Sequence, residues 1–248
     1  MRRLKNAVKR LGKRFVDWAV STKRFPLLQR VIGKTIRYGI RRKRGVIVYY
    51  KDAERSKVFD LIIQIKRETN MLLTDNEAYQ IFMGVKRTQK VPGDTAEVGA
   101  YRGGSGKLIC EAKGSRALHM FDTFEGIPKV DEIDAHLFRA GDFAASVEEV
   151  RAYLAGYKDV YIYKGFFPAT AGPVEDKRFS FVHLDVDTYE STRDCLHFFY
   201  PRLNPGGVII SHDYTGVRGV KKAFDEFYQD KPEPIIELSG SQCLVVKM

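Results

Sequence analysis

This 248-residue chain has few cysteines, no long apolar run and no internal repeats. The three cysteines, Cys110, Cys195 and Cys243, lie far apart. Their spacing argues against a disulfide framework or a zinc site and indicates buried thiols in a reducing compartment. No apolar run approaches the roughly 18 residues that span a bilayer, and the first residues lack a secretory signal pattern. We therefore expect a cytoplasmic protein with one α/β domain plus an extension.

Acidic residues are almost missing from the start of the chain. Residues 1–44 hold 16 lysines and arginines and a single acid, Asp17, which makes a net charge of +15. The rest of the chain has 26 basic and 30 acidic residues, a net charge of −4. This asymmetry indicates an anionic partner for the first segment rather than for the rest. We name residues 1–50 the basic arm.

The basic arm has the pattern of an amphipathic helix. One face of the predicted helix is apolar, and basic residues occupy the other faces. A helix of this kind with aromatic residues on its apolar face is typical of membrane surfaces. We expect the arm to bind an anionic membrane and to make the protein peripheral there. Two alternatives stay open: nucleic-acid binding, which we consider unlikely, and packing or fraying without a partner. The apolar stripe consists of Leu4, Val8, Leu11, Phe15 and Trp18.

Two helices are expected between residues 51 and 93, which we predict to form a helical cap, with Asp75 capping the second helix. From residue 94 to 248 strands and helices alternate, which predicts a doubly wound, Rossmann-like parallel sheet. The last two strands, separated by Gly240, resemble a hairpin. Expected strands are 95–99, 117–122, 159–164, 179–185 and 207–212, and expected helices are 102–113, 146–157, 189–200 and 217–229.

A glycine-rich turn follows the first strand of this alternation. Glu97 lies near the strand end, and Gly99 and Gly103 come next. Glycine lets the backbone turn sharply and approach a ligand closely. Asp122 ends the next strand about 20 residues on, the offset at which an acid binds ribose hydroxyls in nucleotide-binding βαβ units. Such a turn can also be only a tight connection, so Asp122 carries most of this prediction.

Acidic residues also end the fourth and fifth predicted strands. Asp185 and Asp213 should converge, because ligands of doubly wound sheets lie at the carboxyl ends of the strands. Carboxylate oxygens are ligands that Mg²⁺ prefers. His212 is a candidate third ligand of the same ion, although histidine prefers softer metals than Mg²⁺. The alternative is that these acids only end strands and that Asp187 caps the following helix.

Together these residues resemble class I S-adenosylmethionine-dependent methyltransferases, and more narrowly the macrocin/mycinamicin (TylF-type) sugar O-methyltransferase family. The resemblance covers roughly residues 70–248 and implies S-adenosylmethionine, Mg²⁺, a sugar hydroxyl as acceptor and an antiparallel last strand. The family usually has two adjacent aspartates where this chain has His212 and Asp213. The matching segments are EVGAYRGG (97–104), FDTFEGIP (121–128), KGFF (164–167), LDVDTYEST (184–192), PGG (205–207) and HDY (212–214).

The resemblance also implies roles for single residues. The methionine end of the cofactor lies against the turn with Glu97, Gly99 and Gly103, and Asp122 binds the ribose. The metal ligands are Asp185, Asp213 and, less securely, His212. The nucleoside and adenine are bordered by Thr123, Phe124, Gly165 and Phe166.

Methyl transfer needs the acceptor oxygen in line with the methyl group, and a general base can assist it. Asp185 is one predicted catalytic residue, because it would hold the metal. His136, in the loop 126–146, is the other, as the candidate general base. The alternative is that His136 is only an exposed loop histidine. The predicted function is therefore a Mg²⁺-dependent O-methyltransferase acting on a glycan, glycolipid or glycosylated metabolite. The alternative is a catalytically silent protein of this fold that binds an anionic membrane or nucleic acid. A nicotinamide-dependent oxidoreductase is disfavoured by the terminal hairpin. The sequence leaves the oligomeric state open.

Overall fold

The structure, a computed structural model, describes residues 53–128, 130 and 132–248. Residues Ala53–Met248 form one compact unit. The basic arm, for which a membrane-surface helix was predicted, lies outside the described residues. Among the described helices, none combines the length and the apolar character needed to cross a membrane.

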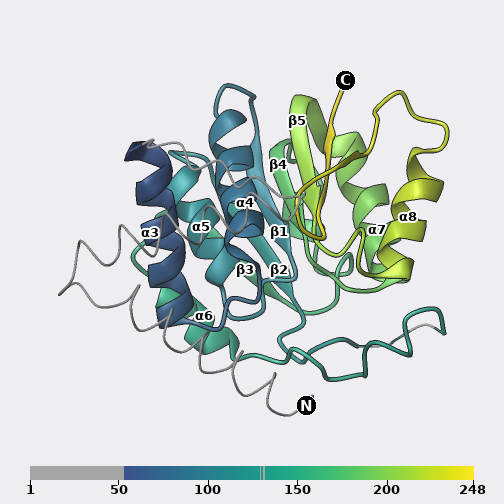
Figure 1. Cartoon of the computed structure of the whole chain (residues 1–248), viewed down its shortest axis with the longest axis horizontal. Coiled ribbons are helices and arrows are strands. Elements are labelled where there is room, and N and C mark those ends of the chain that lie inside the picture. The colour runs from purple at the N-terminus through teal and green to yellow at the C-terminus, as the bar shows by residue number, and fades with distance from the viewer. Residues whose placement is uncertain (1–52, 129, 131) are drawn as a thin grey trace, which may run out of the picture. The chain divides into compact units, whose positions relative to one another are not determined.

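The centre of this unit is a seven-stranded sheet in the order β3-β2-β1-β4-β5-β7-β6 (Figure 1). The first five of these run parallel to one another, whereas β7 is antiparallel to both β5 and β6. The predicted Rossmann-like sheet with an antiparallel last strand is therefore confirmed. The strands are β1 (Asp94–Val98), β2 (Leu118–Asp122), β3 (Val160–Lys164), β4 (Phe179–Leu184), β5 (Leu203–Ser211), β6 (Ile236–Glu237) and β7 (Cys243–Val246).

Helices cover both faces of the sheet, as expected for parallel strands joined by crossovers. Figure 1 shows α3, α4 and α5 on one side of the strands and α7 and α8 on the other. Single 3₁₀ turns at Gly172–Val174 and Tyr200–Arg202 precede β4 and β5. The helices are α3 (Ala53–Glu68), α4 (Asp75–Arg87), α5 (Gly104–Ala112), α6 (Val147–Leu154), α7 (Tyr189–Phe199) and α8 (Arg218–Tyr228).

Each face of the sheet has its own apolar core, because side chains alternate between the faces along a strand. In β4, Phe181 packs in the core under α3–α6, whereas Val182 and Leu184 pack in the core under α7 and α8. Each fully buried side chain of this size contributes about 1.5–3 kcal/mol. The three cysteines are buried and free, as predicted.

The helices before the sheet pack on it directly. Ile62 and Ile65 of α3 and Ile81 of α4 are fully buried in the same core as Phe181. The prediction that Asp75 caps α4 was wrong, because the cap is the preceding residue. Thr74 accepts the backbone N–H of Glu77, and the Glu77 carboxylate accepts the N–H of Thr74, a reciprocal capping box.

Candidate active site

A cavity lies at the carboxyl ends of the parallel strands, between the ends of β1 and β4 where the crossovers diverge to opposite faces. This is the position at which doubly wound sheets bind ligands. Many of the residues predicted for a site meet in its wall, although they come from five different strand ends. These residues are Gly99, Asp122, Thr123, Gly165, Phe166, Asp185, His212 and Asp213.

The turn after β1 passes very close to the end of β4. Gly99 has a φ of +91°, and a Cβ atom there would lie 1.8 Å from the carbonyl oxygen of Asp185. Its N–H donates to the carbonyl of Phe121 at 2.9 Å. Any other residue would therefore collide with β4 and adopt a backbone conformation that only glycine reaches at low cost. The glycine brings the backbone of Ala100 and Tyr101 to the cavity wall.

Asp122 presents a carboxylate to the cavity from the end of β2. One oxygen accepts the N–H of Tyr101 at 2.7 Å and the other accepts the N–H of Phe124 at 2.6 Å. Burial raises the pKa of Asp122, although these backbone donors oppose the shift. A carboxylate oxygen has more than one acceptor site, so a fixed pair of oxygens remains able to bind two neighbouring hydroxyls.

The ends of β2 and β3 form the next part of the wall. The Thr123 hydroxyl donates to the carbonyl of Gly126 at 2.7 Å, which closes the turn after β2. The N–H of Gly165 donates to the carbonyl of Asp122 at 2.9 Å and holds the β3 turn beside it. Phe166 follows and keeps 42% of its surface exposed. An exposed ring at a cavity wall suits contact with a flat aromatic ligand.

A histidine lies between two carboxylates where β4 and β5 end. The Nδ1 atom of His212 is 3.1 Å from Oδ1 of Asp185 and 3.1 Å from Oδ2 of Asp213. Burial opposes charge on the imidazole, but the two carboxylates outweigh burial and raise the pKa of His212 to about 11. Burial also opposes charge on the half-buried Asp185, yet His212 holds the pKa of its carboxyl below the ordinary value.

Two more acids belong to this cluster that sequence reasoning did not place there. Asp187 lines the cavity, and burial and then the charges of Asp185 and Asp213 raise its pKa well above the ordinary value. Glu77 of α4 lies behind the histidine, with Oε2 3.6 Å from Nε2 of His212. The motif around Asp187 was visible in the sequence, but nothing there linked Glu77 to a strand end far along the chain.

The residues Asp185, His212 and Asp213 can bind one cation together. Each offers one ligand atom, and these atoms lie within 4.8 Å of one another. Two carboxylates and an imidazole are ordinary ligands of a divalent metal. The donor set therefore fits a divalent cation.

Four predicted site residues do not line the cavity. Glu97 is fully buried in β1, where Oε1 lies 3.0 Å from Nδ1 of His183, so it supports the wall from behind. Gly103 is the N-cap of α5 and faces α6, because a Cβ atom on it would lie only 3.1 Å from Cγ1 of Val150. The ring of Phe124 is buried in the core under α3–α6, and its backbone N–H donates to Asp122.

His136 is the fourth of these residues. It lies exposed in the loop between β2 and α6. The geometry gives the predicted general-base role of this histidine no support, because neither it nor its immediate neighbours line the cavity. A second histidine, His119 of β2, lies buried between Asp94 and Tyr163, at 3.0 Å and 3.1 Å.

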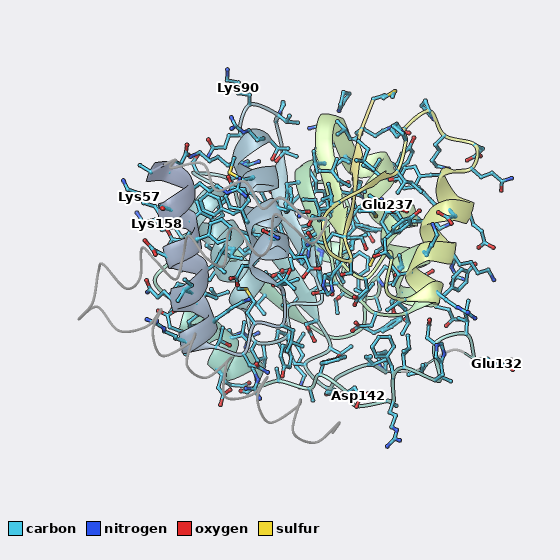
Figure 2. The ribbon with its side chains drawn as sticks, in the orientation of Figure 1. Lys57, Lys90, Glu132, Asp142, Lys158 and Glu237 are labelled. Atoms are coloured by element: carbon cyan, nitrogen blue, oxygen red, sulfur yellow. The ribbon has the colours of Figure 1, made fainter. Side chains whose placement is uncertain are left out.

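The loop between β2 and α6 nevertheless forms one side of the cavity, through Phe138 and Phe143. In Figure 1 it runs along the lower edge of the view, below the strand ends, and Figure 2 shows Glu132 and Asp142 at its periphery. The fully buried carboxylate of Asp134 anchors it. Its oxygens accept the N–H groups at the starts of two helices, which are Tyr189 of α7 at 3.0 Å and Gly219 of α8 at 3.1 Å.

Comparison with known proteins gives one family for this chain. A family model described as Macrocin-O-methyltransferase (TylF) matches residues 77–241. The chain is 36% identical over 171 residues to the 8-demethyl-8-(2,3-dimethoxy-alpha-L-rhamnosyl)-tetracenomycin-C 4'-O-methyltransferase of Streptomyces olivaceus, covering 61% of this chain and 64% of that relative. It is 31% identical over 159 residues to the Mycinamicin III 3''-O-methyltransferase of Micromonospora griseorubida, covering 57% and 62%.

The fold has a matching relative among solved structures. The structure of the O-methyltransferase NovP superposes with a TM-score of 0.67 at 26% identity, and covers 78% of this chain and 99% of that chain. The chain spans less than two thirds of the length of the two curated relatives above.

Proposed function

The chain belongs to the macrocin O-methyltransferase family, whose model matches more than half of it, and from this premise we propose that it transfers the methyl group of S-adenosylmethionine to a sugar hydroxyl. One observation carries the proposal. The carboxylate of Asp122 and the cluster of Asp185, His212 and Asp213 line the same cavity, so a nucleoside-containing donor and a polar acceptor would meet there. Two family relatives have names that state O-methylation, one of them on a rhamnosylated molecule, which supports a glycosylated metabolite as acceptor.

The cofactor would bind along the ends of β1, β2 and β3. Asp122 would accept hydrogen bonds from both ribose hydroxyls, with its oxygens held by Tyr101 and Phe124. The backbone after Gly99 would contact the methionine portion, since the glycine allows close approach. Phe166 would cover the adenine. This arrangement would leave the sulfonium methyl group facing the end of β4.

The reaction is a displacement at the methyl carbon. A lone pair of the acceptor oxygen forms the new C–O bond while the C–S bond breaks, the C–S electron pair goes to sulfur, and the hydroxyl proton passes to water. Positioning contributes most, because oxygen, carbon and sulfur must lie in line. Asp185, Asp213 and His212 would hold a divalent cation, which when bound orients adjacent acceptor hydroxyls and lowers their pKa. The aromatic side chains Phe138 and Phe143 would exclude water from the acceptor side.

Calorimetry with S-adenosylmethionine and with NAD tests the cofactor, and transfer of a labelled methyl group to a rhamnosylated aglycone tests the acceptor. The aglycone without its sugar is the matched control. We expect binding of S-adenosylmethionine alone, and labelling only of the glycoside. Binding of NAD instead would indicate an oxidoreductase. Binding of neither would favour the silent alternative, in which the fold serves only to bind an anionic surface.

We also infer that the basic arm locates the enzyme at an anionic membrane. Its net charge of +15 over residues 1–44 supports this proposal. Each basic residue near such a surface contributes on the order of 1 kcal/mol. A glycolipid or another membrane-proximal glycan would then lie within reach of the site.

A further inference from the structure

The donor atoms at the ends of β4 and β5 are not all oxygen. Of the three residues that can share a cation, Asp185 and Asp213 offer carboxylates and His212 offers an imidazole nitrogen. Mg²⁺ prefers oxygen ligands and retains its waters, whereas imidazole suits later first-row metals. We infer that this site selects a later first-row transition-metal dication such as Co²⁺ over Mg²⁺, with Nδ1 of His212 as a ligand. The inference rests on the proposed cation-assisted methyl transfer and specifies its metal.

The ring of His212 is oriented as a ligand requires. Its Nδ1 faces the two carboxylates, at 3.1 Å from each, whereas Nε2 faces the opposite way, toward the carboxylate of Glu77 at 3.6 Å. A carboxylate behind a metal-binding histidine fixes its tautomer and ring orientation. At 3.1 Å, the Nδ1–H group can donate to the two carboxylates. A bound metal ion would replace this proton, and the neutral imidazole would keep its other proton on Nε2, the side that faces Glu77.

Glu77 is held in this position by contacts that do not involve the histidine. Its Oε2 accepts the N–H of Thr74 at 2.8 Å, and its Oε1 accepts the N–H of Ser241 at 2.8 Å. The Glu77 side chain is 5% exposed. A buried carboxylate that is fixed from α4 and from the β6–β7 turn cannot easily move away from the ring. The histidine is therefore preorganised from a second side.

The backbone of the site is equally fixed. The N–H of His212 donates to the carbonyl of Leu184 at 2.9 Å, which continues the parallel pairing of β4 and β5 to the strand ends. Asp185 is pinned through its own N–H, which donates to the carbonyl of Val98 at 2.9 Å. Two of the three ligand residues are thus fixed by hydrogen bonds at the edge of the sheet. A rigidly placed imidazole lets the site keep its preference for metals that bind nitrogen ligands.

Charge adds to the selectivity. Two carboxylates and a neutral imidazole carry one negative charge fewer than three carboxylates would. Mg²⁺ loses part of the electrostatic attraction that its binding depends on, whereas a transition metal regains it through the nitrogen bond. The competing possibility is that His212 stays protonated and that the imidazolium itself remains the only cation between Asp185 and Asp213.

Equilibrium binding of Mg²⁺, Mn²⁺ and Co²⁺ to the full chain decides between these possibilities. We expect Co²⁺ to bind more tightly than Mg²⁺, with Mn²⁺ between them, and His212→Asp to shrink the Co²⁺/Mg²⁺ affinity ratio by roughly tenfold or more. Glu77→Gln should weaken Co²⁺ binding by about 10–100-fold. The matched control is His197→Asp, on the exposed face of α7, which should leave the ratio unchanged.

Electron spin echo spectroscopy of bound Mn²⁺ gives a readout that does not depend on activity. Nitrogen modulation from the imidazole should be present in the native protein and in His197→Asp, and absent in His212→Asp. An unchanged metal ratio in His212→Asp, a missing nitrogen signal in the native protein, or no metal binding at all would overturn the inference. Calorimetry with S-adenosylmethionine on the same samples keeps the outcomes separate, because retained cofactor binding would leave the proposed methyl transfer standing.

Discussion

A Cβ atom on Gly219 would lie only 2.1 Å from Oδ2 of Asp134, so the loop carboxylate sits directly on the backbone at the start of α8. Asp134 also accepts the N–H at the start of α7. Helix N-termini favour negative charge, because their first N–H groups lack partners within the helix. One buried residue therefore attaches the cavity loop to two helices that are separate in sequence.

We predict that Gly219→Ala will push Asp134 away and loosen this loop. Cofactor affinity and the thermal midpoint should both fall. Asp134→Ala should lower the free energy of unfolding by about 1–3 kcal/mol, since two N–H groups lose their acceptor. Calorimetry and denaturant titration measure both effects. The controls are Gly156→Ala, which has open space around its Cβ, and the exposed Glu132→Gln; an equal loss in the controls would contradict the anchoring role.

Asp122→Asn should weaken binding of S-adenosylmethionine by about 1–3 kcal/mol, because the ribose hydroxyls lose a charged acceptor. Asparagine retains one acceptor oxygen, so the turns held through Tyr101 and Phe124 should survive better than with alanine. Asp176→Asn, at an exposed position in the turn before β4, is the matched control. Titration calorimetry measures the affinity. A folded Asp122→Asn protein with native affinity would remove Asp122 from the cofactor site.

A chelator should abolish methyl transfer while leaving cofactor binding largely intact, because the cation would act on the acceptor. Asp185→Asn should reproduce the effect, since it removes one of the two carboxylates that hold the cation. Turnover and calorimetry, before and after EDTA, separate the two steps. Full turnover in EDTA would show that Asp185 and Asp213 act only as structural residues at the strand ends.

The ionised Glu233 carboxylate should stabilise the protein at neutral pH, and this stabilisation should be lost in acid. Burial opposes its charge, but hydrogen bonds from Lys247, Tyr200 and the N–H of Met248 outweigh it and lower the pKa to about 2. The folded pKa is below the unfolded value of about 4.5. The stabilisation is therefore present above pH 4.5 and is lost as the pH falls toward 2.

The test is Glu233→Gln, which should lower the free energy of unfolding at pH 7 by about 1–3 kcal/mol. The difference from the native protein should shrink as the pH falls from 4.5. Urea titrations across this range measure it, with the exposed Glu237→Gln of β6 as control. A difference that stays constant with pH would mean that the Glu233 charge contributes nothing.

The basic arm should attach the protein to anionic vesicles, since residues 1–44 carry +15 and an apolar stripe. Salt should weaken the attachment without removing it, because screening acts on charges and not on buried apolar side chains. Cosedimentation with vesicles measures the binding of the full chain and of a chain that starts at Val46. Equal sedimentation of both chains, or equal binding to neutral and anionic vesicles, would refute the anchor. Tight binding to RNA or DNA alone would favour the nucleic-acid alternative.

The order of strands and helices from residue 94 onward could be predicted from the sequence alone. Apolar periodicity and glycine positions are local properties, and right-handed crossovers leave few topologies for such an alternation. The convergence of Asp185 and Asp213 followed from the same rule, because each follows the end of a parallel strand and such ends share one edge of the sheet.

Only the tertiary structure decided which of the other predicted residues reach the cavity. Glu97 precedes Gly99 by two positions, yet its side chain points into the core and meets His183, which comes 86 positions later. Phe124 packs in the core rather than in the cavity, and His136 stays in solvent. These outcomes depend on which neighbouring elements leave space, and no local pattern contains that information.

The contacts between distant parts of the chain were also beyond the sequence. Glu77 meets Ser241 across 164 positions, and Asp134 meets Gly219 across 85. A carboxylate far along the chain gives no local sign that it will lie behind a histidine or cap a helix. Such contacts exist because packing of the helices on the sheet brings the groups together and buries them, and a buried carboxylate must find donors.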